Sequence, residues 1–347
     1  MALIPDTQYY TMKKFGGTPE MFFAQTRWIA QNAKRLNIAF ALHLGDITDT
    51  GDVFENAEWD IADAAMKILE DPKVSGLPHG VPYDICVGNH DQRFLAPDGK
   101  HKYNGPALYF DKYFGIKRFQ GRPYYGGHYG DNNKNHYTLF DAGSAKFIVV
   151  SLDYRAPAKN PAVLEWAAGL LDQHADRQAI ILTHDSLLPG VPGSFGTDGA
   201  AVFNALKTKP NLLLIVGGHT TGEGWRTDTR EDLPPVHSLV QDFQLDENGG
   251  DGWLRLLTFS PAENKILATT YSPFLDRWRD DPAGKFSIPH DFGTKIAPFE
   301  KIASVKTSPG KTVSVPWKTP APAREWFAEI SDGRKTIRTA PQLIPAP

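Results

Sequence analysis

Five short polar clusters, each directly after an apolar run, constrain the fold of this 347-residue chain more than any other feature. The clusters are Asp6-Thr7-Gln8, Gly45-Asp46, Gly88-Asn89-His90-Asp91, Thr183-His184-Asp185 and Gly217-Gly218-His219. One such cluster would indicate only a turn, because Gly-Asn and His-Asp pairs are ordinary turn residues. Five of them place carboxylate, amide and imidazole groups where strands end, and such turns meet when the strands share a sheet. The pattern predicts a metal site built by a whole domain.

The segments between the clusters predict an α/β layered domain. Thr18-Pro19 is a capping residue followed by proline at the first helical position, and apolar residues then recur at helical spacing. Residues 38–44 form a near-continuous apolar run, which is typical of a strand covered on both faces. A helix over 54–69 and a strand over 83–87 continue the alternation, which is the signature of stacked helices and sheets.

The second half of the chain changes from alternating to antiparallel elements. The expected elements up to residue 216 are strands over 146–152, 179–182 and 212–216 and helices over 160–174 and 199–206. Three further strands are expected over 236–243, 253–259 and 265–271, the last two as a hairpin. We therefore predict one main domain over 1–272. Residues 273–347 are rich in proline and are predicted to form a β-rich C-terminal extension with a hairpin turn at Asp332-Gly333.

Residues 97–135 interrupt the rhythm with a run rich in Gly, Asn, Tyr and His. A long loop in a compact domain is usually functional, so this segment is predicted to be a wall of the substrate site. His101 and His128 are its best candidates for a direct role. The alternative is a solvated insertion whose tyrosines cover the body of the domain. The sequence leaves both interpretations open.

The charge pattern excludes some classes of partner. The chain has 37 basic and 40 acidic residues without a run of like charge, so neither a nucleic-acid-binding surface nor a basic membrane patch is expected. No apolar stretch approaches the roughly 20 residues that a membrane span needs. The single cysteine, Cys86, excludes an intrachain disulfide and is expected to be a small buried side chain.

The amino terminus, Met1-Ala2-Leu3-Ile4, offers only a very short strand before the first ligand turn and has no pattern of signal-peptide type. We expect that a preceding segment has been removed. If that segment was a signal, an extracytoplasmic location, periplasmic or secreted, is expected.

Taken in order, the motifs D-x-Q, G-D-x-x-D, G-N-H-D, T-H-D and G-G-H resemble those of the calcineurin-like metallophosphoesterases, a family that includes purple acid phosphatases and many phosphodiesterases. The resemblance spans Asp6 to Tyr271, and the ordered set is specific although each motif alone is weak. It implies two mixed β-sheets packed together with helices outside, which is a four-layer arrangement. It also implies a pair of divalent metal ions at the strand ends.

The resemblance assigns ligand roles to residues of all five clusters. Asp46 would bridge the two ions, and Asp6 would bind the first ion only. Asn89, His184 and His219 would complete the second site, which then has two oxygen and two nitrogen donors. This ligand set suits Mn, Fe or Zn. A bridging carboxylate would hold the ions about 3.5–4 Å apart, where both can bind one phosphate.

The resemblance also implies a catalytic histidine. His90 would face the leaving-group oxygen of the substrate, and Asp91, directly after it, would orient the ring. Asp49 closes the run Gly45-Asp46-Ile47-Thr48-Asp49 and is predicted to be a turn residue or to support the ligands from outside. The chemistry needs no nucleophilic side chain, which agrees with the lack of a Gly-x-Ser-x-Gly elbow in the sequence.

Two positions depart from the family pattern, and both affect the first metal ion. Gln8 stands where most relatives have the histidine of Asp-x-His, and Thr221 stands where they have the second histidine of Gly-His-x-His. Oxygen donors that could complete this site are Gln8, Thr221 and Glu223, and His128 is the imidazole that could be recruited instead. Oxygen donors predict a weaker site that prefers Mn, Mg or Ca.

The resemblance therefore implies a metal-dependent phosphoester hydrolase, a phosphomonoesterase or a phosphodiesterase, that acts on a small-molecule phosphoester. A water held between two ions would attack phosphorus in line, and His90 would assist the departing alkoxide. The alternative is a degenerate member that binds metal or phosphate without efficient turnover, which Gln8 and Thr221 suggest. The retained His90 favours the enzyme.

Overall fold

The computed structural model describes residues 1–54, 57–292, 304–308, 311, 314, 325–326, 328–331, 336–338 and 342–343. The chain divides into two compact units, one of Met1–Thr258 and Leu267–Ile288 and the other of Phe259–Ile266 and Pro289–Pro347. Each unit is described by itself. The assignment of residues 273–347 to a separate extension stays a prediction.

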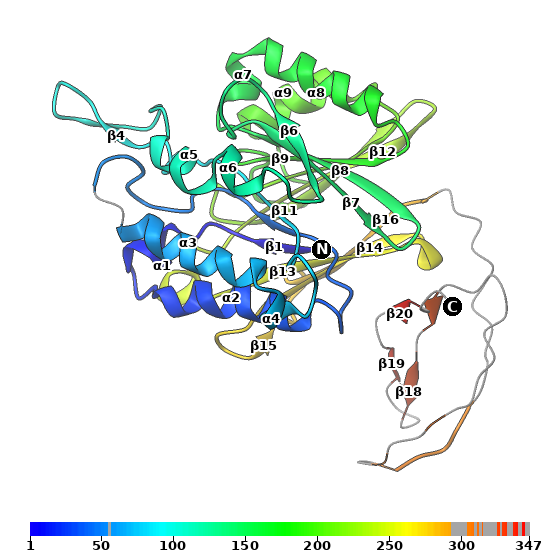
Figure 1. Cartoon of the computed structure of the whole chain (residues 1–347). Coiled ribbons are helices and arrows are strands. Elements are labelled where there is room, and N and C mark those ends of the chain that lie inside the picture. Colours follow the sequence, from blue (N-terminus) through cyan, green and yellow to red (C-terminus); the bar gives the residue numbers. More distant parts are fainter. Residues whose placement is uncertain are drawn as a thin grey trace. The chain divides into compact units, whose positions relative to one another are not determined.

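The first sheet is mixed and has β1 near its centre (Figure 1). Its strands are β1 Ala2–Ile4, β2 Ala41–His43, β3 Tyr83–Ile85, β13 Leu254–Ser260, β14 Lys265–Ser272, β15 Arg277–Trp278 and β16 Lys285–Pro289. The order is β15-β14-β13-β1-β2-β3, with β16 paired to β14. β1, β2 and β3 are parallel, whereas β13 is antiparallel to β1. The three parallel strands are completely buried, as their apolar sequences predict.

The second sheet is also mixed. Its strands are β6 Tyr125–His128, β7 His136–Ala142, β8 Ala145–Leu152, β9 Gln178–Thr183, β10 Leu212–Gly217, β11 Gly222–Arg230 and β12 Leu233–Asp242. The order is β11-β12-β10-β9-β8-β7-β6. The four strands β12, β10, β9 and β8 run parallel. β11 and β7 pair antiparallel with the two ends of this group, and β6 pairs antiparallel with β7. The C-terminal ends of the parallel strands therefore lie along one edge of the sheet.

Helices cover the outer faces of both sheets, so the first unit has four layers (Figure 1). The helices are α1 Gln8–Met12, α2 Pro19–Asn32, α3 Ala57–Glu70, α4 Pro72–Ser75, α5 Leu108–Phe114, α6 Ile116–Phe119, α7 Ala156–Lys159, α8 Pro161–Gln173, α9 Thr197–Leu206, α10 Glu247–Gly250 and a 3₁₀ turn at Pro261–Glu263. In the described chain, no helix is both long and apolar enough to cross a membrane. The predicted fold class, two packed mixed sheets flanked by helices, is confirmed.

Helices α8 and α9, which pack on the second sheet, show why the sequence folds this way. α8 begins at Pro161 after Asn160, as the cap-and-proline pattern predicts. Its apolar stripe and that of α9 pack on the second sheet, with Ala167 and Val202 buried among sheet residues such as Ile181. The burial of these stripes fixes the helices on the sheet and leaves the strand ends free for the ligand turns.

Residues 97–135 are not the long loop that their composition predicts. The segment holds β5 His101–Lys102, which pairs with β4 Phe94–Leu95, followed by α5, α6 and the edge strand β6. Phe110, Phe114 and Phe119 are completely buried and anchor the two short helices. The prediction was wrong because helices of one or two turns are too short to show a periodic pattern between glycines.

The part of the second unit that the structure describes contains two short pairs of antiparallel strands near the C-terminus. β17 Glu325–Trp326 pairs with β20 Gln342–Leu343, and β18 Glu329–Ser331 pairs with β19 Thr336–Arg338, both antiparallel. The predicted turn at Asp332-Gly333 lies outside the described residues.

A buried polar contact joins the two sheets of the first unit. Asp84 on β3 accepts a hydrogen bond of 2.8 Å from the Thr138 hydroxyl on β7, and its other oxygen lies 2.8 Å from His136 Nε2. All three side chains are completely buried. A buried polar group needs a partner, so this contact specifies how the two sheets face each other.

We expect Asp84→Ala to lower the free energy of unfolding by at least about 2 kcal/mol, because each buried polar group left unpaired costs about 1–3 kcal/mol. Urea denaturation of the metal-free protein measures this loss. The control is Asp172→Ala, which removes an exposed ion pair with Lys209 and should change stability by no more than about 0.5 kcal/mol. Equal stability of the two variants would contradict the role given to Asp84.

Candidate metal centre

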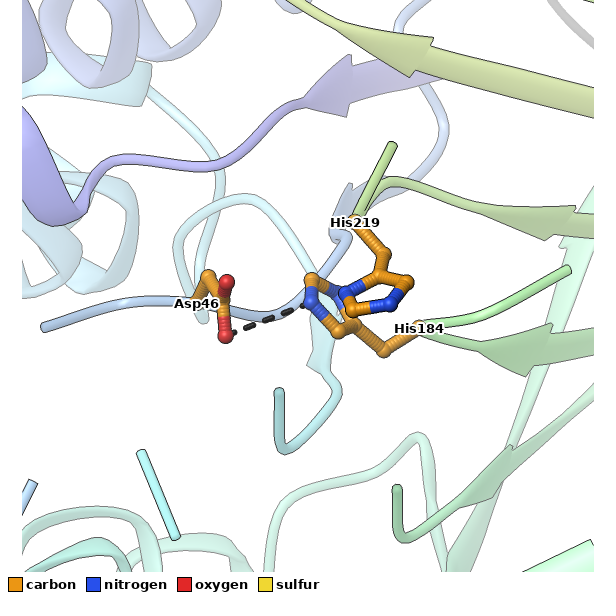
Figure 2. Close-up of side chains that lie close together, drawn as sticks. All are labelled: Asp46, His184 and His219. Atoms are coloured by element: carbon orange, nitrogen blue, oxygen red, sulfur yellow. Dashed lines mark ion pairs between the residues drawn. The ribbon is translucent and has the colours of Figure 1, made fainter. Parts of the chain in front are cut away.

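The structure brings predicted ligands from both sheets to one place. Asp6 and Asp46 follow β1 and β2 of the first sheet, and His184 and His219 follow β9 and β10 of the second. Figure 2 shows Asp46, His184 and His219 pointing toward one another. One donor atom of each of these three residues lies within 4.8 Å of the others. Their arrangement is one that could hold a metal ion.

The ring of His184 is held so that one nitrogen faces the carboxylates. Its Nδ1 lies 2.8 Å from the Leu44 carbonyl and donates to it. Its Nε2 lies 3.2 Å from Asp46 Oδ1 and 3.9 Å from Asp6 Oδ2 (Figure 2). Burial lowers the pKa of His184, but Asp46 and Asp6 outweigh it and raise the pKa to about 10. The imidazole therefore carries a proton at neutral pH unless a cation displaces it.

Unsatisfied buried atoms support metal binding at this place. Asn89 Oδ1 and Gln8 Oε1 are buried without a hydrogen-bond partner, and His184 Nε2 has only its ion-pair contacts. All three are donor atoms of residues predicted to bind metal. Buried polar atoms are normally paired, so a cation is the partner that this set of donors fits.

Asp6 lies beside the histidine turn of the second sheet. Its Oδ2 accepts a hydrogen bond of 3.1 Å from the backbone nitrogen of His219. Burial and the nearby charge of Asp242 raise the pKa of Asp6 well above its usual value. Asp46 and His219 have positive φ angles of 49° and 74°, which non-glycine residues rarely adopt and which cluster at functional sites. The ligand turns are thus conformationally strained.

Glycines of one cluster make room for ligands of another. A Cβ atom on Gly88 would lie 2.1 Å from Asp46 Oδ1, and one on Gly218 would lie 1.9 Å from Asp6 Oδ1. A Cβ atom on Gly45 would lie 2.5 Å from His184 Nδ1. A residue larger than glycine would overlap a side chain of another turn at each of these positions. The close approach of the turns therefore requires glycine there, whatever backbone conformation the turn itself needs.

His90 sits at the site with a carboxylate partner that differs from the predicted one. Its Nδ1 lies 3.0 Å from Asp49 Oδ1 and 3.1 Å from the Asp49 carbonyl, and its backbone nitrogen donates to Asp46 Oδ1 at 2.8 Å. Burial lowers the pKa of His90, but Asp46 and Asp49 raise it to about 9. Asp49 thus supports the site from outside, as predicted for it.

The predicted orienting role of Asp91 is wrong. Its carboxylate accepts hydrogen bonds from the backbone nitrogens of Gly88, Ile47 and Thr48, at distances of 2.9 to 3.0 Å. These bonds occupy the carboxylate, tie the second ligand turn to the third and leave Asp49 as the partner of the His90 ring. Asp91 is a structural residue of the turns because the local chain offers its carboxylate three amide donors.

Only some of the candidate residues for the first metal site lie near Asp6 and Asp46 in the structure. Glu223 forms ion pairs with Arg255 and Arg279, so its carboxylate is already neutralised. Thr221 donates its hydroxyl to Asp242 Oδ2 at 3.2 Å. His128 lies on the edge strand β6, where its Nδ1 contacts the Gly130 carbonyl. Glu223 and His128 are therefore not ligands in this arrangement.

Sequence reasoning missed Asp242 and Gln244. Asp242 ends β12 and accepts from the backbone nitrogen of Gln244 at 2.8 Å and from its Nε2 at 2.6 Å. The side chain of Gln8 donates to Gln244 Oε1 and, at 3.3 Å, to Asp46 Oδ2. Asp242 follows an apolar strand as the five clusters do, but without a histidine or glycine beside it to mark a site.

Comparisons with known proteins identify the family of the chain. A family model described as calcineurin-like phosphoesterase matches residues 2–222. The chain is 34% identical over 277 residues to the uncharacterized protein YvnB of Bacillus subtilis (strain 168), an alignment that covers 78% of this chain and 19% of YvnB. The chain thus spans about one fifth of the length of that relative.

Two solved structures have a similar course of the chain. One is GAP50, the anchor in the inner membrane complex of Plasmodium, with a TM-score of 0.45 and 12% identity over 84% of this chain and 87% of GAP50. The other is a dimetal phosphatase from Danio rerio, with a TM-score of 0.46 and 14% identity over 78% of this chain and 89% of that one.

We expect Gly88→Ala to abolish metal retention, because the added Cβ atom would displace the Asp46 carboxylate. Gly169→Ala is the matched control, since a Cβ atom there meets nothing within 4 Å. Metal content after purification, measured by elemental mass spectrometry, should be near zero for Gly88→Ala and unchanged for Gly169→Ala. Full metal content in folded Gly88→Ala would show that Asp46 is not a ligand.

Proposed function

Because the chain belongs to the calcineurin-like phosphoesterase family, we propose that it is a metal-dependent phosphoester hydrolase. The observation that carries the proposal is the convergence of Asp46, His184 and His219. Asn89, whose Oδ1 is buried without a hydrogen-bond partner, is proposed to complete the set. These residues come from both sheets and form a two-oxygen, two-nitrogen set. Such a set suits Mn, Fe or Zn.

Divalent cations held there would neutralise phosphoryl oxygens and lower the pKa of a water so that it can attack phosphorus. The chain itself contributes the placement of charge. The Asp46 carboxylate contacts His184 Nε2 and accepts a hydrogen bond from the backbone nitrogen of His90. It therefore lies between His184 and the turn that carries His90. Asp6, whose carboxylate accepts a hydrogen bond from the His219 amide, would supply negative charge for the cation of the first site.

His90 is proposed to donate a proton to the leaving group. Its Nδ1 contacts Asp49, which leaves Nε2 available to donate to a substrate oxygen. The Asp49 contact favours the protonated ring, which is the form that a general acid requires. The ring of Tyr103 lies 5.3 Å from that of His90, and Arg93 lies over Tyr103, so this side would contact the leaving group.

We propose a small-molecule phosphoester as the substrate, either a monoester or a diester. The charge balance of the chain, with no basic run, supports a small substrate over a nucleic acid. The rival proposal is a protein that binds metal or phosphate without turnover. It is supported by Gln8 and Thr221, which hold hydrogen bonds where the family has imidazoles. The His90–Asp49 contact supports the enzyme, because a binding protein has no need of an acid.

The test is metal analysis of the purified chain together with hydrolysis of a panel of phosphate mono-, di- and triesters. His184→Ala should remove the tightly held ion and the activity together, because it deletes one of four ligands. His128→Ala is the control, since its ring contacts only a local carbonyl, and it should keep both. Retained metal without hydrolysis of any ester would favour the binding protein. A fully metallated, active His184→Ala protein would exclude the proposed site.

We expect His90→Asn to reduce turnover by about 10²- to 10⁴-fold while metal content stays normal, because a general acid contributes that much. Asp49→Asn should reduce turnover less, since it removes only the partner of the ring. Esters with acidic leaving groups should be affected less by either change than esters of alkyl alcohols. Equal losses on both kinds of ester would contradict the acid role.

A further inference from the structure

Three carboxylates are buried together at the ligand edge. Asp6, Asp46 and Asp242 are exposed by only 2%, 1% and 0%. His184 pairs with the first two. Asp242 has no ion pair with a basic side chain in the described part of the protein, and its contacts are the neutral groups of Gln244 and Thr221. A buried charge without a counter-charge is unfavourable, so this group lacks a cation.

The register of the second sheet explains why Asp242 reaches the site. β12 is parallel to β10, and the last pair of that ladder sets Val240 opposite Gly217, so Asp242 and His219 each follow it by two residues at the same edge of the sheet. On its other side, β12 pairs with β11, with Asp242 opposite Gly222, directly after Thr221. Asp242 therefore approaches the place from which the missing imidazole at position 221 would project, and it accepts the Thr221 hydroxyl.

An unpartnered amide oxygen points to a ligand at the same place. Gln8 is completely buried, and its Nε2 donates to Asp46 and to Gln244, so its amide lies between the Asp46 carboxylate and the partner of Asp242. Its Oε1 is buried without a hydrogen-bond partner. A buried amide oxygen without a partner is a donor that a hard cation can use.

We propose that Asp242 is a ligand of the first cation, taking the place of the missing imidazole, together with Asp6, Asp46 and Gln8. Gln244 and Thr221 hold the Asp242 carboxylate in position. All donors of this site are oxygen atoms, so it takes a hard divalent cation, Mn, Mg or Ca, in preference to Zn. This inference rests on the proposed function in one respect, because it assumes that a tighter ion occupies the second site. The assignment of Asp242 to the first ion rests on the contacts of Asp242 and Gln8.

The test is titration of the 347-residue protein with Mn²⁺, in which the electron paramagnetic resonance signal of free Mn²⁺ is measured. Wild-type protein should bind two ions, one tight and one weak. Asp242→Asn should retain the tight ion and weaken the other at least about 10-fold, since even outer partners of ligands contribute about 10- to 100-fold to affinity. Asp246→Asn, which changes an acid 45% exposed beside Arg279, should bind both ions as wild type does.

A second measurement does not depend on the stability of the variant. In wild-type protein with Zn²⁺ in the tight site, added Mn²⁺ should show no nitrogen coupling in pulsed resonance spectra, because the first site has no imidazole ligand. Nitrogen coupling at that ion, or unchanged weak binding in Asp242→Asn, would overturn the proposal. Loss of the weak ion in a protein that hydrolyses no ester would support Asp242 as a ligand while the proposed function fails.

Discussion

The contact between Asp46 and His184 is the interaction on which the rest of the site depends. Asp46 follows β2 in one sheet, His184 follows β9 in the other, and their atoms approach to 3.2 Å. Both side chains are buried, so neither can remain unpaired without a large loss of free energy. The two sheets must therefore dock with their C-terminal edges aligned, and the positions of the other ligand turns follow from that alignment.

The fold and the close approach of three predicted site residues could be predicted because their signals are local. An apolar run followed by a polar turn marks Asp46, His184 and His219, and the structure brings these three together. The two mixed sheets follow from the same alternation of buried strands with amphipathic helices. Each of these signals lies within a short segment of the sequence, so it can be recognised without knowing which distant residues are in contact.

The remaining features depend on contacts between distant segments. Asp49, not Asp91, partners His90, because the turn aims the Asp91 carboxylate at backbone amides. Asp242 reaches Thr221 through the pairing of β12 with β11, which its neighbours in sequence do not reveal. The helices within 97–135 are held by phenylalanines that pack inward, and their short length hides the periodicity. Tertiary packing decides each of these cases.

The close approach of glycines to ligands has a consequence for how such a site can change in evolution. Gly88 borders Asp46, Gly218 borders Asp6, and Gly45 borders His184, so each motif reserves space for a side chain encoded elsewhere. A motif cannot be replaced by a bulkier version alone, since the obstruction would appear in another segment. The five clusters therefore have to vary as an interlocking set, and covariation among them carries more information than conservation within any one.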